Sequence, residues 1–168
     1  MKRFLQFAKL KRTSFLNQIF QFERKTKVAC GSYYTSVILN DGNVRFFGYN
    51  SYGQTDVPDL GGRKAVAISC GANHSAILLE DGTVRFFGSN GCGKTNIPDL
   101  GGRKAVAIAC GANHSAILLE DGTVRFFGSN CYGQTDVPDL GGRKAVAIAC
   151  GTYHSAILLD DGTVRFFG

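Results

Sequence analysis

The sequence predicts an all-β fold: about four tandem units of 40 residues, each a β-propeller blade, behind a short basic leader that is helical in one interpretation. Residues 61–100 and 101–140 differ at only six positions. The repeat register is marked by a Cys-Gly pair at Cys30, Cys70, Cys110 and Cys150. A period near 40 residues with several short strands is typical of a propeller blade. A β-solenoid is the second interpretation, but its coils are normally shorter and lack regular Asp-Gly hairpins.

The strands within one unit follow from hydrophobic periodicity. Residues 104–110 alternate large with small side chains, which indicates a strand whose alanine face meets a close layer. Residues 114–120 form a nearly continuous apolar run, typical of a strand covered on both sides. Asp121-Gly122, between this run and residues 123–128, is a strong hairpin signal. We therefore expect an antiparallel meander of three strands in each unit.

The rest of the unit, residues 129–143, is rich in Gly and contains Asn and Pro, so it cannot contain a long element. Gln134–Val137 is compatible with a brief fourth strand at a sheet edge, because it precedes Pro138 and proline donates no ladder hydrogen bond. No helix is required in residues 28–168. A small sheet cannot bury both faces alone, so we expect successive units to stack face to face.

The charge divides the chain into two parts. Residues 1–27 hold eight Lys or Arg against one acid, a net charge of +7, whereas residues 28–168 hold eleven basic and twelve acidic residues, a net charge of −1. A nearly neutral array lacks the broad positive field that binds nucleic acid, so no nucleic-acid partner is predicted for it. We assign an aromatic-rich leader to residues 1–22 and the repeat array to residues 23–168, with units 23–60, 61–100, 101–140 and 141–168.

The leader permits three interpretations. As a helix it would place Phe4, Phe15 and Ile19 on one side, interrupted by Lys9 and Arg12. A mitochondrial presequence, a membrane-surface helix and a segment that packs on the end of the array all fit this pattern. No stretch approaches about 18 consecutive apolar residues, so no transmembrane segment is predicted.

The six cysteines do not form the pattern of a disulfide framework. Four of them end the same predicted strand in successive units, and separate sheets rarely bring such positions within the roughly 7 Å between Cα atoms that a disulfide needs. We expect these four to be small core residues in a reducing compartment, and hence an intracellular protein of the cytoplasm or nucleus. Cys92 and Cys131 lie instead in the variable loop.

The motif Cys-Gly-x-x-His, followed by Asp-Gly and then by aromatic-Gly-x-Asn-x-x-Gly-Gln, resembles the repeat of the regulator of chromosome condensation family. The resemblance covers residues 28–168 and implies a propeller, usually of seven blades. The chain departs from the family at Tyr34, which replaces the histidine of the first unit. It also departs at three phenylalanines that stand where the family often has tryptophan: Phe87, Phe127 and Phe167.

Four copies cannot close a seven-blade ring. They fit a fragment of a longer protein or a partial propeller that completes itself by association, and in the second case we expect self-association through open ends. No segment resembles the insertion through which the founding family member engages its small GTPase. Nucleotide exchange is therefore not carried over from the resemblance.

Residues Gly88 to Thr95 match the phosphate-binding loop pattern, in which Lys94 would contact phosphates and Thr95 a magnesium ion. The neighbouring units have glutamine in place of Lys94, so the match occurs in one copy alone. Asn96 to Pro98 cannot open the long helix that such a loop requires. We therefore expect no nucleotide or other cofactor.

Histidine follows cysteine at the spacing Cys-x-x-x-His in three units, as Cys70/His74, Cys110/His114 and Cys150/His154. A structural zinc site needs four converging ligands, whereas these pairs lie one per unit. We expect each histidine to begin a strand and to hydrogen-bond a neighbouring carbonyl. The serine that follows each histidine points to the opposite face, and most carboxylates lie in turns. No catalytic residue, metal site or enzymatic activity is predicted.

The variable loop is the candidate contact surface, because nearly identical units differ there. Its predicted contact residues are Tyr49, Ser51, Tyr52, Ser89, Gly91, Cys92, Ser129, Cys131 and Tyr132. The repeated Arg-Lys pairs at 63/64, 103/104 and 143/144 are expected to pair with acids of their own unit rather than to form a binding rim.

These observations favour a non-enzymatic protein-interaction scaffold with a protein partner of unknown identity. Two alternatives stay open. One is a guanine-nucleotide exchange factor for a small GTPase, and the other is the substrate-recognition region of a larger ubiquitin ligase.

Overall fold

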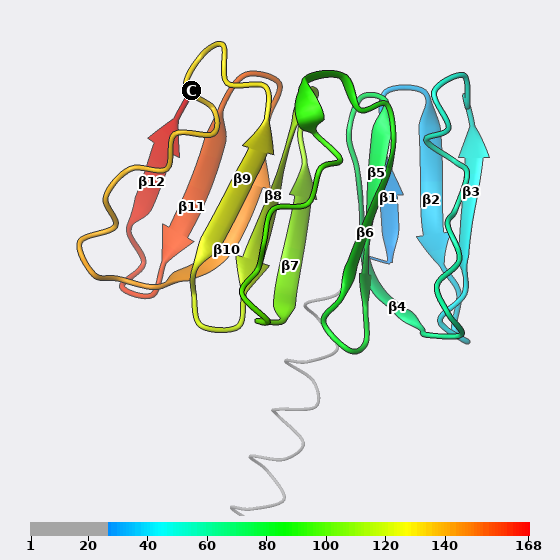
Figure 1. The fold of residues 1–168 in the computed structure, drawn as a ribbon, viewed down its shortest axis with the longest axis horizontal. Helices are drawn as coiled ribbons and strands as arrows, with labels where there is room; N and C mark the ends of the chain where they lie inside the picture. The colour runs from blue at the N-terminus through cyan, green and yellow to red at the C-terminus, as the bar shows by residue number, and fades with distance from the viewer. Residues whose placement is uncertain (1–26) are drawn as a thin grey trace, which may run out of the picture.

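The computed structural model describes residues 27–168, which form an all-β array (Figure 1). Four antiparallel sheets of three strands each stand side by side in chain order. This confirms the predicted all-β fold of blade-like units. The leader at residues 1–22, with its three interpretations, lies outside the described residues. Within the described part of the chain, no helix is long and apolar enough to cross a membrane.

Each unit contributes one sheet whose strands pair in chain order. The first sheet contains β1 (Val28–Cys30), β2 (Tyr34–Ile38) and β3 (Val44–Gly48). The second contains β4 (Ala65–Cys70), β5 (His74–Leu79) and β6 (Val84–Gly88). The third contains β7 (Ala105–Cys110), β8 (His114–Leu119) and β9 (Val124–Gly128). The fourth contains β10 (Ala145–Cys150), β11 (Ser155–Leu159) and β12 (Val164–Phe167).

The Asp-Gly turns join the second and third strands of every sheet, as the sequence predicts. In the third unit the backbone N–H of Gly122 donates to Leu119 O at 3.0 Å, and Gly122 has a φ of 86°. Glycine adopts this left-handed conformation without steric cost. Asp121 Oδ1 accepts the backbone N–H of Thr123 at 2.9 Å, which closes the turn from the other side.

The predicted fourth strand at Gln134–Val137 is wrong, because these residues form turns. The N–H of Asp136 donates to Gly133 O at 3.0 Å, and a backbone donor used inside a turn is not available to a neighbouring strand. In the second unit one short 3-10 turn, η1 (Gly91–Gly93), stands directly before the corresponding segment. Within this turn Cys92 adopts a φ of 64°.

The hydrophobic core lies between successive sheets rather than within one of them. Leu78 and Val84 of the second sheet meet Ile117 and Leu119 of the third in one buried cluster. Leu118 points the other way and belongs to the cluster between the third and fourth sheets. β8 is therefore covered on both sides, as its apolar run predicts. An equivalent cluster joins the first sheet to the second.

The Phe-Phe pair of the third strand connects each inner sheet to both of its neighbours. Phe86 meets Phe127 of the following unit edge to face, with ring centroids 5.2 Å apart. Phe87 meets Phe46 of the preceding unit at 5.4 Å. Because neighbours on a strand point to opposite faces, one pair of adjacent residues serves two junctions. Such ring pairs contribute about 0.5–1.5 kcal/mol each beyond their burial.

Close packing of two backbones explains the glycine of the Cys-Gly pair. A Cβ added at Gly111 would overlap the carbonyl oxygen of Gly151 and lie 2.6 Å from Cε1 of His114. The N–H of Ala112 donates to that same carbonyl at 3.2 Å. Gly71 stands in the same relation to Gly111. The pair therefore marks the point where successive units come closest.

All six cysteines have free thiols. Cys110 is buried and Cys70 and Cys150 are partly buried, but Cys30 is exposed, so the predicted core role is wrong for Cys30. The reason is that the repeated cysteine faces the preceding unit, as Cys70 Sγ does at 3.7 Å from Ala29 O, and no described sheet precedes the first one. Burial raises the pKa of the Cys150 thiol to about 12, so this thiol stays protonated.

Gly111→Ala should lower the free energy of unfolding by about 1–3 kcal/mol, because the added methyl group pushes the next unit away. Urea unfolding followed by circular dichroism measures the change. Gly91→Ala is the matched control, since the nearest atom to its added Cβ is Ser89 Oγ at 4.0 Å. Equal destabilisation by the two substitutions would contradict the close-packing role.

Candidate interaction surface at the loop edge

Two loops from each of the first three units, and one from the fourth, meet at one edge of the array, the upper edge in Figure 1. The loop between the first two strands lies beside the segment that follows the third strand. In the first unit the N–H of Tyr49 donates to Tyr33 O at 2.9 Å, and the next two units repeat this bond. We call this surface the loop edge, and it consists of residues 31–33, 49–52, 71–73, 89–92, 111–113, 129–132 and 151–153.

The asparagine and glutamine of the Gly-x-Asn-x-x-Gly-Gln motif hold the loop in place. Asn50 Oδ1 accepts the N–H of Thr55 at 2.9 Å, and its Nδ2 donates to Asp56 Oδ1 at 2.6 Å. Gln54 is 1% exposed, and its Oε1 accepts the N–H of Tyr52 at 2.9 Å. The third unit repeats all three bonds. The motif thus fixes the backbone and leaves the side chains between its members free to vary.

Three tyrosines of the first unit form an exposed cluster at the loop edge. Tyr33, Tyr49 and Tyr52 are 76%, 44% and 53% exposed. The rings of Tyr33 and Tyr49 have centroids 6.3 Å apart, and those of Tyr49 and Tyr52 are 6.2 Å apart. The three rings therefore make one aromatic surface open to solvent.

A second aromatic cluster joins the third unit to the fourth. Tyr132 and Tyr153 are 62% and 55% exposed, with ring centroids 4.9 Å apart. The second unit has Asn73 and Cys92 at the corresponding positions, so no tyrosine stands between the two clusters. The loop edge thus presents aromatic surface near both ends of the array.

The structure places all nine predicted contact residues at the loop edge. Ser89 and Ser129 are half-buried and the other seven are exposed. The fold brings Tyr49 and Tyr52 into one cluster and sets Tyr132 against Tyr153 of the next unit. Their role in binding stays a prediction.

The sequence analysis missed Tyr33 and Tyr153. They occupy the second variable position of Cys-Gly-x-x-His, where the inner units have Asn73 and Asn113. The same comparison of aligned units that selected the variable loop identifies this position too. It was overlooked because the motif was considered for metal binding rather than for the residues inside it.

Beneath the loop edge, a buried hydrogen bond crosses each junction between units. His74 Nε2 lies 2.8 Å from Ser115 Oγ of the next unit, and the following junction repeats this contact at 2.9 Å. Tyr34 takes the place of histidine at the first junction, where its hydroxyl donates to the carbonyl oxygen of His74 and lies 3.0 Å from Ser75 Oγ. The predicted carbonyl partner of the histidine is therefore wrong. Stacking of the sheets brings a serine hydroxyl of the next unit to the ring instead.

The hydrogen bonds assign the tautomer of His74. Ser115 Oγ donates its one proton to Lys94 O at 2.7 Å, so it accepts from the Nε2–H of His74. Nδ1 is then an acceptor with no partner among residues 27–168. A histidine that donates to a serine cannot remove the serine's proton, and both side chains are 0% exposed. This geometry makes the contact structural and not a nucleophile-base pair.

Burial keeps the junction histidines neutral. Burial lowers the pKa of His74 to about 3, and the nearby charge of the Lys94 amine adds to the effect. The pKa of His114 is also lowered, again mainly by burial. Within the part of the chain that the structure describes, no three His, Cys, Asp or Glu side chains are grouped to hold a metal ion.

Lys94 occupies the position of the buried motif glutamine. Its side chain is 3% exposed, and its Nζ donates to Asn113 Oδ1 at 2.9 Å. Burial lowers the pKa of this amine. The chain after Thr95 forms turns and irregular structure rather than a helix. The phosphate-loop pattern at residues 88–95 therefore lacks the geometry that phosphate binding requires.

The arginine of each Arg-Lys pair binds the hairpin aspartate of its own unit, as the sequence predicts. The salt bridges have N–O distances of 3.0 to 3.1 Å and join Arg63 to Asp81, Arg103 to Asp121 and Arg143 to Asp161. Exposed pairs of this kind contribute about 0–1 kcal/mol each. They hold the end of the segment that crosses from the loop edge to the next sheet.

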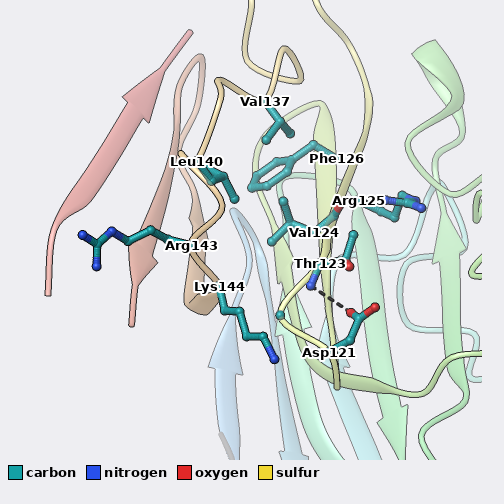
Figure 2. A pocket seen from close by; sticks show the side chains of 10 residues that line it. Asp121, Thr123, Val124, Arg125, Phe126, Val137, Leu140, Arg143 and Lys144 are labelled. Carbon is teal, nitrogen blue, oxygen red and sulfur yellow. Dashed lines mark hydrogen bonds between the residues drawn. The ribbon is translucent and has the colours of Figure 1, made fainter. Parts of the chain in front are cut away.

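A groove of about 520 Å³ lies between the third sheet and that crossing segment (Figure 2). Its apolar lining consists of Val124, Phe126, Val137 and Leu140. Its other end is lined by Lys144 and Asp121, as Figure 2 shows, so it presents charges of both signs. We consider this groove a weaker candidate than the loop edge, because its charges are of mixed sign and it has no buried polar anchor.

Comparison with known proteins agrees with this architecture. The sequence profile of the regulator of chromosome condensation (RCC1) repeat matches residues 26–54, 65–94, 105–134 and 145–168. The chain belongs to the RCC1 repeat family. Each match contains the Cys-Gly pair and one three-stranded sheet, so the resemblance stated from the sequence is confirmed. A comparison with curated protein sequences gives no match.

Solved structures of low sequence identity share the fold. Human WBSCR16 superposes with a TM-score of 0.75 at 23% identity, over 84% of this chain and 46% of its own. Prp20p of Saccharomyces cerevisiae superposes with a TM-score of 0.71 at 19% identity, over 84% of this chain and 43% of its own. The ectodomain of the receptor kinase CR4 of Physcomitrella patens superposes with a TM-score of 0.69 at 21% identity, over 84% of this chain and 40% of its own. The chain thus spans less than half the length of these structures.

Acidification from pH 7 to pH 5 should lower the free energy of unfolding by about 2 kcal/mol through His74 alone. The pKa of His74 is about 3 in the folded protein against an ordinary 6.5, so the unfolded chain takes up the proton first. Stability is full above pH 6.5 and falls as the pH drops towards 3. In urea unfolding at several pH values, the free energy of unfolding should depend less steeply on pH in His74→Asn than in the wild type. Identical slopes would contradict a buried neutral imidazole.

Lys94→Gln should raise the free energy of unfolding by about 1 kcal/mol, because it removes a buried amine that has a neutral partner. The reciprocal change, Gln134→Lys, is the matched test in the third unit and should lower stability. Thermal and urea unfolding measure both effects. A stabilising effect of Gln134→Lys would show that the position tolerates a charge.

Proposed function

We propose that the chain is a non-enzymatic protein-interaction scaffold whose contact surface is the loop edge. The observation that carries this proposal is the presence of exposed tyrosine clusters on loops that the repeat motif holds rigid. Tyr33, Tyr49 and Tyr52 form the first cluster, and Tyr132 and Tyr153 form the second.

Tyrosine suits such a surface for physical reasons. It offers a large amphipathic contact area while losing few rotamers on binding, and it is enriched among residues that dominate interface energetics. The backbone bonds of Asn50 and Gln54 hold the loop before a partner arrives, which lowers the entropy cost of association. Exposed rings on a fixed backbone are therefore suited to bind rather than to fill a core.

The contact between serine and histidine in the described part of the chain supports a non-enzymatic role. Where serine and histidine meet, at His74 and Ser115, both are buried and the serine proton is donated to a carbonyl. The exposed side chains of the loop edge carry aromatic, amide, hydroxyl or thiol groups. This composition favours contact over chemistry.

Structural neighbours support protein partners as a class. The Prp20p structure is described with that protein's binding properties to Gsp1p and histones, and the same yeast protein has been solved bound to Kap60. Those are partners of Prp20p. Its sequence identity of 19% to this chain supports a shared fold and not shared partners. For this chain we propose a protein partner and leave its identity to experiment.

The test replaces tyrosines with the residues that the chain itself uses at equivalent positions. Tyr33→Asn and Tyr49→Ser introduce the residues of the second unit, where the same backbone accepts them. Partners captured by the wild-type chain and quantified by mass spectrometry should be lost from this double variant, and a purified partner should bind it roughly tenfold or more weakly.

The control lies at the opposite edge of the sheets. Asn43→Thr also introduces the residue of the other units, and it preserves the turn that Asn43 makes with Asp41. It should leave binding unchanged. Retention of every partner by both the double variant and Tyr153→Asn would refute the loop edge as the contact surface.

A further inference from the structure

The two ends of the array expose opposite halves of one junction. The face of each sheet that meets the following unit is its trailing face, and the face that meets the preceding unit is its leading face. On the trailing face of the third sheet Leu118 and Val124 are 4% and 7% exposed. The equivalent residues of the fourth sheet, Leu158 and Val164, are 37% and 40% exposed, and Phe166 is 73% exposed.

Among residues 27–168, nothing covers the leading face of the first sheet either. Val28 is 59% exposed, whereas its equivalent Ile68 in the second sheet is 2% exposed. Phe47 is 57% exposed, while its equivalents Phe87 and Phe127 are half-buried against a preceding unit. What remains open at each end of the described array is a sheet face.

We propose that the trailing face of the fourth sheet binds the leading face of the first sheet of a second copy of this chain. The internal junctions identify this occupant, because the same trailing-face residues are covered three times by leading faces of the same repeat. The first unit is the one described unit whose leading face is uncovered. The association is therefore head to tail, through a heterologous contact. Copies add to the assembly until it closes into a ring or a free face is blocked.

Aromatic residues are matched across the proposed contact. Inside the array Phe126 meets Phe167 edge to face, with ring centroids 5.1 Å apart. A shift of the repeat register by one unit places Phe166 against the residue equivalent to Phe167, which in the first unit is Phe47. Both rings are exposed in the single chain and are available to form this pair.

The buried hydrogen bond of each junction also finds its partner. His74 and His114 are 0% exposed and bond the serine hydroxyl of the next unit, whereas His154 is exposed. The residue of the first unit at that serine position is Thr35, which retains a hydroxyl. In the head-to-tail pair, His154 of one copy donates to Thr35 of the other.

The test is the mass of the 168-residue chain in solution, measured by sedimentation over a range of concentrations. The wild type should form species of two or more copies. Phe47→Asp blocks the leading face and Phe166→Asp blocks the trailing face, so each variant alone should be monomeric, with self-association weakened roughly tenfold or more. An equimolar mixture should form a one-to-one dimer and nothing larger, because each variant retains one intact face.

Controls separate this contact from unfolding and from other surfaces. Val106→Asp places the same charge on a side chain that is 52% exposed within an inner unit, and should leave association unchanged. If either phenylalanine variant fails to give the wild-type circular dichroism spectrum, Val28→Asp and Val164→Asp replace them. A wild-type monomer at every concentration overturns the proposal. Dimers of Phe47→Asp alone would overturn the head-to-tail direction, since they require contact between two trailing faces.

Discussion

Every sheet in this array depends on its neighbour for a hydrophobic surface, because no sheet buries its own two faces. The contact between successive sheets sets the period of the sequence: a residue and its partner about 40 positions later must face each other across the junction. At the narrowest point Gly111 lies against the carbonyl of Gly151, which leaves no room for a side chain. The hydrogen bond between histidine and serine and the phenylalanine ladder follow from the same stacking.

This constraint also explains where the units are allowed to differ. A residue such as Phe87 contacts one neighbour while the adjacent Phe86 contacts the other, so both faces of a strand are fixed in every copy. The variable part of the loop edge, at residues 49–52, 89–92 and 129–132, escapes this double requirement because it lies outside the sheets. Its backbone is held locally by asparagine and glutamine, and Tyr49 and Ser89 can therefore occupy equivalent positions. Variation and exposure coincide at this edge, which is where binding is proposed.

Local signals made most of the fold predictable, and contacts across junctions explain the errors. Alternation and Asp-Gly turns identified the three strands, since both act within about ten residues of the chain. The partner of His74 was missed because Ser115 becomes its neighbour only after stacking. The fourth strand was overpredicted because the apolar Val137 lies in a segment whose backbone donors close turns. Tyr33 and Tyr153 were detectable by aligning the units, but their ring contacts were not.

The first junction shows which part of the buried hydrogen bond the fold requires. Tyr34 replaces histidine there, and its hydroxyl lies 3.0 Å from Ser75 Oγ, the equivalent of the serine that His74 contacts at the next junction. Burial raises the pKa of Tyr34 well above its ordinary value, as expected for a phenol kept neutral inside a protein. A neutral polar tip of suitable length reaches the serine of the next unit, whichever ring carries it. In this chain the position thus requires a neutral polar side chain that reaches the next unit, and not a group that exchanges a proton.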